Sequence, residues 1–346
     1  MSYDVVVVGG GIGGLTVAAL LSARGVKTCL LERNSQVGGC VARVEFAGHD
    51  FEPGMGLYTS FGPGEIYDRV FAELLVDVPE TSLLPGSENF YSIKGGPATV
   101  AERLAESIKK SGGALRLNSP VLRLAYDETG QYAIGVDLLS RETVIARKAI
   151  VSNLTIWDTY GKLIGLNRTP LETKKLLKTL QGSGAYVVYA SIEESAIARL
   201  PGEHFRIAGE TDFTVAISPA GSAPDGKRAV TFVTNTDVTD WFAYQSSEEE
   251  YEERDQSALA DFWSRLHAAL PTLGGDIEII ETANPRTYYD TTRRKLGMVL
   301  GLASPSQLTH QTSLPNVFIV GDTITPEPRL DLVVESALAL ANQLTK

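Results

Sequence analysis

Glycines at a fixed spacing near the start of the chain have the pattern of a phosphate-binding turn. Gly9, Gly11 and Gly14 satisfy GxGxxG directly after a Val-rich run and directly before an apolar run with helical spacing. The first glycine permits a tight turn, the second lets the backbone approach a pyrophosphate, and the third lets helix and strand pack closely. The phosphate would lie at a helix N-terminus, where the dipole favours negative charge. This context predicts a dinucleotide site, to which we assign Gly9, Gly11, Ile12, Gly13 and Gly14.

A carboxylate follows where a dinucleotide fold needs one. Glu32 stands 18 residues after Gly14 at the end of the next expected strand, and there it would accept hydrogen bonds from an adenosine ribose. From Glu32 the chain continues through Arg33 to Gly38-Gly39, which resembles the E(K/R)xxxxGG extension of FAD-containing amine oxidases, protoporphyrinogen oxidases and phytoene desaturases. The resemblance implies FAD. No second GxGxxG follows a strand, which argues against a separate NAD(P)H-binding domain. A nicotinamide-dependent dehydrogenase is therefore only the second candidate, after an FAD protein.

The surrounding pattern predicts the elements that hold these residues. Buried strands at 3–8 and 27–31 enclose a helix at 15–24, and a strand at 316–320 precedes a helix at 332–344. Between them, strand-like runs at 114–117, 121–126, 131–139 and 143–151 follow a helix at 99–111. Alternating runs at 184–192, 205–217 and 228–235 lie between helices at 170–180 and 248–270, which indicates a second domain with antiparallel strands.

Composition and charge restrict the partner. The 346 residues carry a net charge of −11, which would repel nucleic acids and anionic membrane surfaces. No apolar run is long enough to span a membrane. The two cysteines, Cys29 and Cys40, form no CxxC pair and indicate a cytoplasmic setting without a disulfide framework or metal site. We therefore expect a small-molecule substrate, and a homo-oligomer stays open.

Four segments resemble the phytoene desaturase and carotenoid cis-trans isomerase group of flavoproteins. They carry Gly38-Gly39-Cys40 with Phe51-Glu52-Pro53-Gly54-Met55, the Gly95-Gly96 block reaching Val121, Ser152-Asn153 with Trp157-Asp158-Thr159, and Gly321-Asp322 before the last helix. The resemblance implies that the Val121 backbone faces adenine, that Asp322 lies near the ribityl or phosphate region, and that the helix starting near Leu332 points at the flavin pyrimidine edge. It adds these residues to the expected FAD contacts: Arg33, Gly38, Gly39, Cys40, Gly54, Met55, Val121, Asn153, Gly321, Asp322 and Leu332. Cys40 is expected to be a small buried thiol rather than a covalent tether.

The chain departs from this group at two places. After Gly321-Asp322 the group usually has P-G-x-G, whereas here Pro326 is followed by Glu327, Pro328 and Arg329. We expect Glu327 and Arg329 to lie near the flavin-facing cavity, where they pair with each other, bind substrate or remain hydrated. The stretch between Gly54 and Gly95 is also short for the group, which argues against a carotenoid substrate.

The side chains that could act in catalysis are few. FAD would supply the hydride or electron chemistry, so a protein base is optional, and the scattered histidines favour none. Arg293 could bind an anionic substrate or stabilise the negative charge of a reduced flavin. It could equally belong to a solvent-exposed basic turn with no role in the reaction. The catalytic candidates are therefore Arg293, Glu327 and Arg329.

The fold class predicted from all of this is α/β. A Rossmann-like FAD domain of the glutathione-reductase type is expected over 1–64, 95–155 and 285–346, with an interleaved α+β substrate domain over 65–94 and 156–284. The predicted function is an FAD-dependent oxidoreductase that oxidises or isomerises a C–C bond of a small apolar or partly polar substrate. An amine or amino-acid oxidase and a non-catalytic flavin-binding protein are the alternatives.

Overall fold

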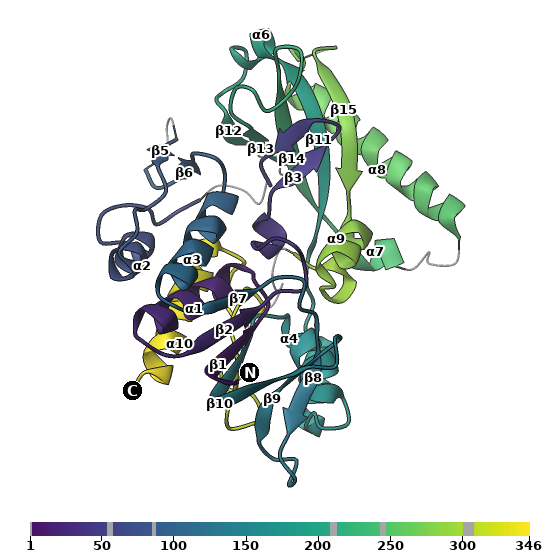
Figure 1. Cartoon of the computed structure of the whole chain (residues 1–346). Coiled ribbons are helices and arrows are strands. Elements are labelled where there is room, and N and C mark those ends of the chain that lie inside the picture. The colour runs from purple at the N-terminus through teal and green to yellow at the C-terminus, as the bar shows by residue number, and fades with distance from the viewer. Residues whose placement is uncertain are drawn as a thin grey trace.

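Two β-sheets organise the chain, one in each half of the molecule (Figure 1). The computed structural model describes residues 2–53, 58–84, 88–207, 213–242, 247–273, 275–299 and 308–346. Gly54 and Met55, two of the expected FAD contacts, lie outside the described residues.

The first sheet has seven strands in the order β7-β2-β1-β10-β9-β8, and β16 also pairs with β10. Its strands are β1 (Ser2–Val8), β2 (Thr28–Leu31), β7 (Ala114–Arg116), β8 (Val121–Tyr126), β9 (Ala133–Leu138), β10 (Thr143–Ser152) and β16 (Val317–Ile319). The strands β7, β2, β1, β10 and β16 run parallel, whereas β8 and β9 form an antiparallel extension.

The register of the parallel strands brings four chain segments to one edge. Val8 is paired with both Leu31 and Ser152, and Ser152 is paired with Ile319. The residues that leave the carboxyl ends of these strands therefore lie together, and they include Gly9, Glu32, Asn153 and Gly321. In a parallel α/β sheet this edge is where ligands bind.

Helices cover one face of the first sheet. They are α1 (Ile12–Ala23), α2 (Ile66–Leu74), α3 (Ala98–Lys110) and α10 (Leu330–Leu344), and they share one hydrophobic cluster with Val5, Val7 and Val151. Almost every residue of α1 is buried, because α3 and α10 pack on its sides. Figure 1 shows the yellow C-terminal helix α10 beside the purple N-terminal helix α1, so the two ends of the chain build one layer. The segment 65–74, expected in the substrate domain, packs here as α2.

The opposite face is covered by the segment that follows β10. It contains α4 (Ile156–Asp158), the π-helix η2 (Thr159–Gly165) and α5 (Leu171–Thr179). Trp157, Tyr160 and Leu163 pack against Val6, Ile150 and Ile319 in a second hydrophobic cluster. The segment therefore lies directly below the carboxyl edge of the sheet.

The second sheet is antiparallel, with the order β12-β13-β14-β11-β15. Its strands are β11 (Gly184–Glu193), β12 (His204–Ile207), β13 (Phe213–Ile217), β14 (Lys227–Thr236) and β15 (Ile277–Ala283). The long helix α8 (Glu248–Ala269) covers one face through Phe262 and Leu266. The other face packs on Phe51, from the ribbon of β3 (Val44–Phe46) and β4 (His49–Phe51), and on Val299.

The remaining elements are η1 (Gly39–Val41), β5 (Thr81–Leu83), β6 (Tyr91–Ile93), α6 (Glu194–Ile197), α7 (Val238–Phe242), α9 (Pro285–Thr292) and η3 (Lys295–Gly297).

The predicted α/β class, with its Rossmann-like first unit, is confirmed. Tyr288 and Tyr289 lie in the helix α9, which the sequence analysis did not predict. The side chain of Asn284 accepts hydrogen bonds from the backbone N–H groups of Arg286 and Thr287, and Pro285 occupies the first helical position. These features start a helix. No helix among the described residues is long and apolar enough to cross a membrane.

Gly14 is the position where the strand-turn-helix unit tolerates no side chain. A Cβ placed there would lie 2.2 Å from the carbonyl oxygen of Gly9. We expect Gly14→Ala to lower the free energy of unfolding by about 1–3 kcal/mol, because the backbone must shift to relieve the overlap. Gly161→Ala is the control, since a Cβ there meets nothing within 4 Å. Equal thermal unfolding midpoints for the two variants would contradict this packing.

Candidate cofactor and substrate site

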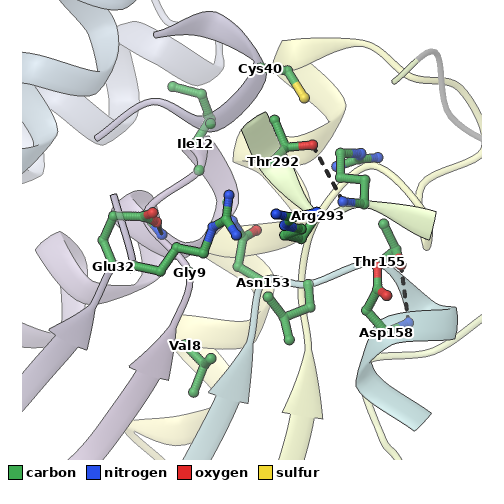
Figure 2. Close-up of a pocket in the computed structure, with 18 of the residues that line it drawn as sticks. Val8, Gly9, Ile12, Glu32, Cys40, Asn153, Thr155, Asp158, Thr292 and Arg293 are labelled. Atoms are coloured by element: carbon green, nitrogen blue, oxygen red, sulfur yellow. Dashed lines mark hydrogen bonds between the residues drawn. The ribbon is translucent and has the colours of Figure 1, made fainter. Parts of the chain in front are cut away.

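A cavity of about 640 Å³ opens at the carboxyl edge of the first sheet. Its wall combines the turn after β1, the ends of β2 and β10, the segment from 119 to 122, and residues after α9 and β16. This volume is in the range of ligand pockets. Figure 2 shows side chains from the first and last thirds of the chain facing the same space.

The glycine turn presents backbone donors to the cavity. The helix α1 starts after Gly11 with no side-chain cap and no acidic residue in its first turn, so its first N–H groups keep no side-chain partner. A second glycine segment lies on this turn, because Gly38 N–H donates to the Gly10 carbonyl oxygen at 2.8 Å. Gly38 has φ 114°, which favours glycine. The arrangement fits a phosphate group, which accepts such donors.

Asn153 fills the space that the glycines leave open. A Cβ at Gly11 would lie 2.6 Å from Asn153 Nδ2, and one at Gly13 would lie 2.8 Å from Asn153 Oδ1. The backbone N–H of Asn153 donates to the Val8 carbonyl oxygen at 2.8 Å, which fixes the residue at the strand end. The amide side chain therefore forms part of the cavity floor beside the turn.

Glu32 is fixed by two backbone hydrogen bonds. Its Oε2 accepts from Gly10 N–H at 2.6 Å, and its Oε1 accepts from Asn34 N–H at 2.8 Å. The side chain is almost fully buried and lines the cavity. Each carboxylate oxygen has a further lone pair, so Glu32 can still accept hydrogen bonds from two ligand hydroxyl groups. This donor set fits a ribose.

An ion pair lies in the part of the wall that also contains Cys40 and Val299, called here the inner end of the cavity. Arg294 Nη2 lies 2.6 Å from Asp322 Oδ2, and both side chains are largely buried. Burial lowers the pKa of Arg294, but the charge of Asp322 opposes this and the net shift is upward. Cys40 lies beside the pair. Burial raises the pKa of its thiol, and the charge of Arg294 offsets only part of the shift.

Asp158 and Lys162 line the wall, although the sequence did not assign them to the site. Asp158 is buried, and its carboxylate accepts from Thr155 Oγ1 at 2.5 Å, from Lys295 N–H at 3.1 Å and from Lys162 Nζ at 2.7 Å. Lys162 Nζ also donates to the Arg293 carbonyl oxygen at 3.1 Å. Trp157-Asp158-Thr159 belongs to a segment that resembles the family, but no sequence signal connects it to residues 293–295.

The structure brings most of the expected FAD contacts into one wall. Gly9, Gly11, Ile12, Gly13, Glu32, Arg33, Gly38, Gly39, Cys40, Val121, Asn153, Gly321 and Asp322 all line the cavity. Gly14 packs against Gly9 behind the turn and does not line the cavity. In α10, the residues of the described wall are Leu330 and Val333, and Leu332 is not among them. Contact of these residues with FAD stays a prediction.

The catalytic candidates are distributed differently. Arg293 and Arg329 line the cavity, whereas Glu327 is largely exposed and is not part of the described wall. Arg329 makes two hydrogen bonds to Asp331, at 2.5 and 3.1 Å, and lies 3.5 Å from Glu327. Its main partner is thus the buried carboxylate in the first turn of α10.

Family comparisons agree with this geometry. Residues 7–74 match a model described as an NAD(P)-binding Rossmann-like domain, and residues 79–327 match flavin containing amine oxidoreductase. The second match covers more than half of the chain, so the chain belongs to the flavin containing amine oxidoreductase family. The predicted family and the FAD cofactor are confirmed, and the chain is placed among the FAD-dependent oxidoreductases.

Individual relatives are more distant. The chain is 25% identical over 271 residues to a chloroplastic prolycopene isomerase of Arabidopsis thaliana, covering 72% of this chain and 44% of that protein. It is 44% identical over 69 residues to a carotenoid 3,4-desaturase of Haloarcula japonica, covering 20% of this chain and 13% of that protein. The chain therefore spans less than half the length of these curated relatives.

Solved structures share the fold over the full chain. An oxidoreductase from Methanosarcina mazei has a TM-score of 0.74 at 15% identity and covers 99% of this chain and 100% of its own. A putrescine oxidase variant has a TM-score of 0.67 at 13% identity and covers 99% of both chains. At these identities the likeness defines the fold.

Glu32→Ala tests the ribose end of the site. We expect it to weaken FAD binding by on the order of 1.5–3 kcal/mol, because it removes charge-assisted hydrogen bonds. Fluorescence titration of flavin-free protein with FAD measures the change. Glu65→Ala is the matched control, since Glu65 also accepts a backbone N–H, from Gly62 at 2.6 Å, outside the cavity. Equal FAD affinities in the two variants would contradict the assignment.

Cys40 gives a second prediction. Because the raised pKa keeps its thiol protonated at neutral pH, Cys40 is a poor nucleophile and no covalent bond to the flavin is expected. Heat denaturation should release all the flavin into the supernatant, both in the wild type and in Cys40→Ser. Flavin that stays on the precipitated wild-type chain but not on the variant would contradict this.

Proposed function

We propose that this chain uses bound FAD to oxidise or isomerise a C–C bond of a small apolar or partly polar substrate. The observation that carries the proposal is the state of the carboxylates in the described wall. Glu32 accepts two backbone N–H groups, Asp158 pairs with Lys162, and Asp322 pairs with Arg294. None of them is placed as a free general base, which a reaction driven by protein acid–base groups requires.

The chemistry then depends on the cofactor, and the protein positions it. When bound, FAD supplies hydride or electron transfer. The glycine turn and Glu32 orient the dinucleotide, whereas Cys40 and Val299 give the inner end of the cavity an apolar surface that excludes water. Behind them lies the apolar face of the second sheet, with Tyr189 and Phe51 in ring contact at 5.0 Å.

We also propose that the two parts of the chain built around the two sheets bind different ligands. Residues 1–64, 95–155 and 285–346 would hold FAD, and residues 65–94 and 156–284 would shape the substrate space. Two observations refine these limits. The helix α2 packs with α1 and α10, and the ribbon β3–β4 is tied to the second sheet, where Asp50 N–H donates to the Ser222 carbonyl oxygen at 2.8 Å.

An amine or amino-acid oxidase is the alternative within the same family. A substrate carboxylate would need a cation that is free to bind it, and Arg293 and Arg329 are the residues expected to offer one. Arg329 is engaged within the chain by two hydrogen bonds to Asp331. Arg293 lines the cavity and has only a largely exposed ion pair with Asp290, so this alternative rests on Arg293. Two of the curated relatives are named prolycopene isomerase and carotenoid 3,4-desaturase, which favours the C–C reaction. The short 54–95 stretch supports a substrate smaller than a carotenoid. We keep a cytoplasmic setting as part of the proposal.

The reaction class has a direct test. The purified holoprotein should be bleached by a chemical reductant, and it should show no peroxide production with a panel of amines and amino acids. A panel of short isoprenoid alkenes, analysed by mass spectrometry, should yield a product that has lost two hydrogen atoms or an isomer of unchanged mass. Peroxide production with an amine would establish the alternative, and a flavin that resists every reductant would indicate a non-catalytic flavin-binding protein.

A further inference from the structure

The cavity wall has the opposite charge to the rest of the molecule. The chain carries a net charge of −11, yet the wall holds five cations, Arg33, Lys162, Arg293, Arg294 and Arg329, against the three carboxylates Glu32, Asp158 and Asp322. The wall therefore has an excess of two positive charges.

The pairing of these groups shows which cations are left over. Lys162 is paired with Asp158, Arg294 with Asp322, and Arg329 with Asp331 just outside the wall. Arg33 has no ion pair in the described part of the chain beyond the proximity of its neighbour Glu32, which is tied to backbone N–H groups. Arg293 lies 3.2 Å from Asp290, but both side chains are more than half exposed, so this pair contributes little.

Arg33 and Arg293 approach the cavity from opposite parts of the fold. Arg33 extends from the end of β2, and its Nη2 donates to the carbonyl oxygen of Thr291 in the last turn of α9. Burial is the main cause that lowers the pKa of Arg33, and the positive charge of Arg293 lowers this pKa further. The hydrogen bond to Thr291, two residues before Arg293, thus holds the Arg33 guanidinium group near Arg293.

Arg293 is held in an unusual backbone conformation. It has φ 56°, in the left-handed region that favours glycine. Its carbonyl oxygen accepts from Lys162, and Lys162 is fixed by the buried Asp158. Strain that is stabilised by its surroundings is typical of functional positions. Figure 2 shows Arg293 together with Gly9, Asn153 and Asp158, which line the same cavity.

We propose that Arg33 and Arg293 clamp the cofactor diphosphate from the side opposite to the N-terminus of α1. The diphosphate carries one negative charge on each phosphate, which matches the two wall cations that form no buried ion pair among the described residues. Arg293 is then a cofactor ligand rather than a catalytic residue. In this arrangement the cofactor lies between the segment after α9 and the first sheet. The negative charge of the bound cofactor reduces the repulsion between the two arginines.

The test uses the holoprotein and compares two displacing ligands. ADP contains the diphosphate, whereas adenosine lacks it, so the ratio of their potencies in displacing FAD isolates the phosphate contacts. Variants Arg33→Met and Arg293→Met should each release FAD about tenfold faster than the wild type, as expected for a lost charge-assisted hydrogen bond. The advantage of ADP over adenosine should fall by a similar factor. Added salt should shrink these differences, because it screens the wild-type contact.

Two further variants separate binding from folding. Arg293→Gly removes the charge and relieves the left-handed strain, so it should weaken FAD retention without lowering the thermal stability of the flavin-free protein. Arg286→Met removes a cation from the same helix, where Arg286 pairs with Glu248 at 3.2 Å outside the cavity, and it should leave the ADP advantage unchanged. An ADP advantage that is unchanged in both Arg33→Met and Arg293→Met overturns the clamp, as does lost turnover with wild-type FAD retention in Arg293→Met. Either result leaves the proposed C–C reaction untouched, since that proposal rests on the substrate panel.

Discussion

The alignment of parallel strand ends is the constraint on which the rest of the structure depends. Val8, Leu31, Ser152 and Ile319 are held in one register by β1, β2, β10 and β16. A shift of one residue would turn every side chain of a strand to the other face and would separate the glycine turn from Glu32, Asn153 and Gly321. Because the covering layer joins α1 to α10, the site needs both ends of the chain.

Electrostatics divides the cavity into regions with different tasks. Near the glycine turn, backbone N–H groups and arginines favour an anion. At the inner end, Arg294 and Asp322 neutralise each other, and Cys40 and Val299 give an apolar surface. The buried Asp158 connects these regions. It pairs with Lys162, which donates to the Arg293 carbonyl oxygen, and it accepts a hydrogen bond from the Lys295 backbone N–H. A negatively charged protein can thus hold an anionic cofactor beside an apolar substrate space.

Local sequence signals indicated the residues that the structure gathers around the glycine turn. Gly9 to Gly14, Glu32 and Gly38-Gly39 act through neighbouring backbone, so their pattern is visible in the chain itself. The resemblance to a known family added Asn153, Gly321 and Asp322, which meet the turn only through the sheet. Asp158 and Lys162 could not be assigned, since their partners at 293–295 are more than a hundred residues away. The helix α9 was not predicted, although Asn284-Pro285 marks its start. The preference of Arg329 for Asp331 over Glu327 depends on the geometry of the first turn of α10.

The central claim is that the carboxyl edge of the first sheet holds FAD through its adenosine diphosphate half. The most direct measurement is a calorimetric titration of the flavin-free chain with FAD and, separately, with FMN, which has the same flavin ring but no adenosine half. One FAD per chain and a much weaker interaction with FMN is the result that this account predicts. Equal affinity for FMN and FAD, or tight binding of NAD in place of both, would contradict it.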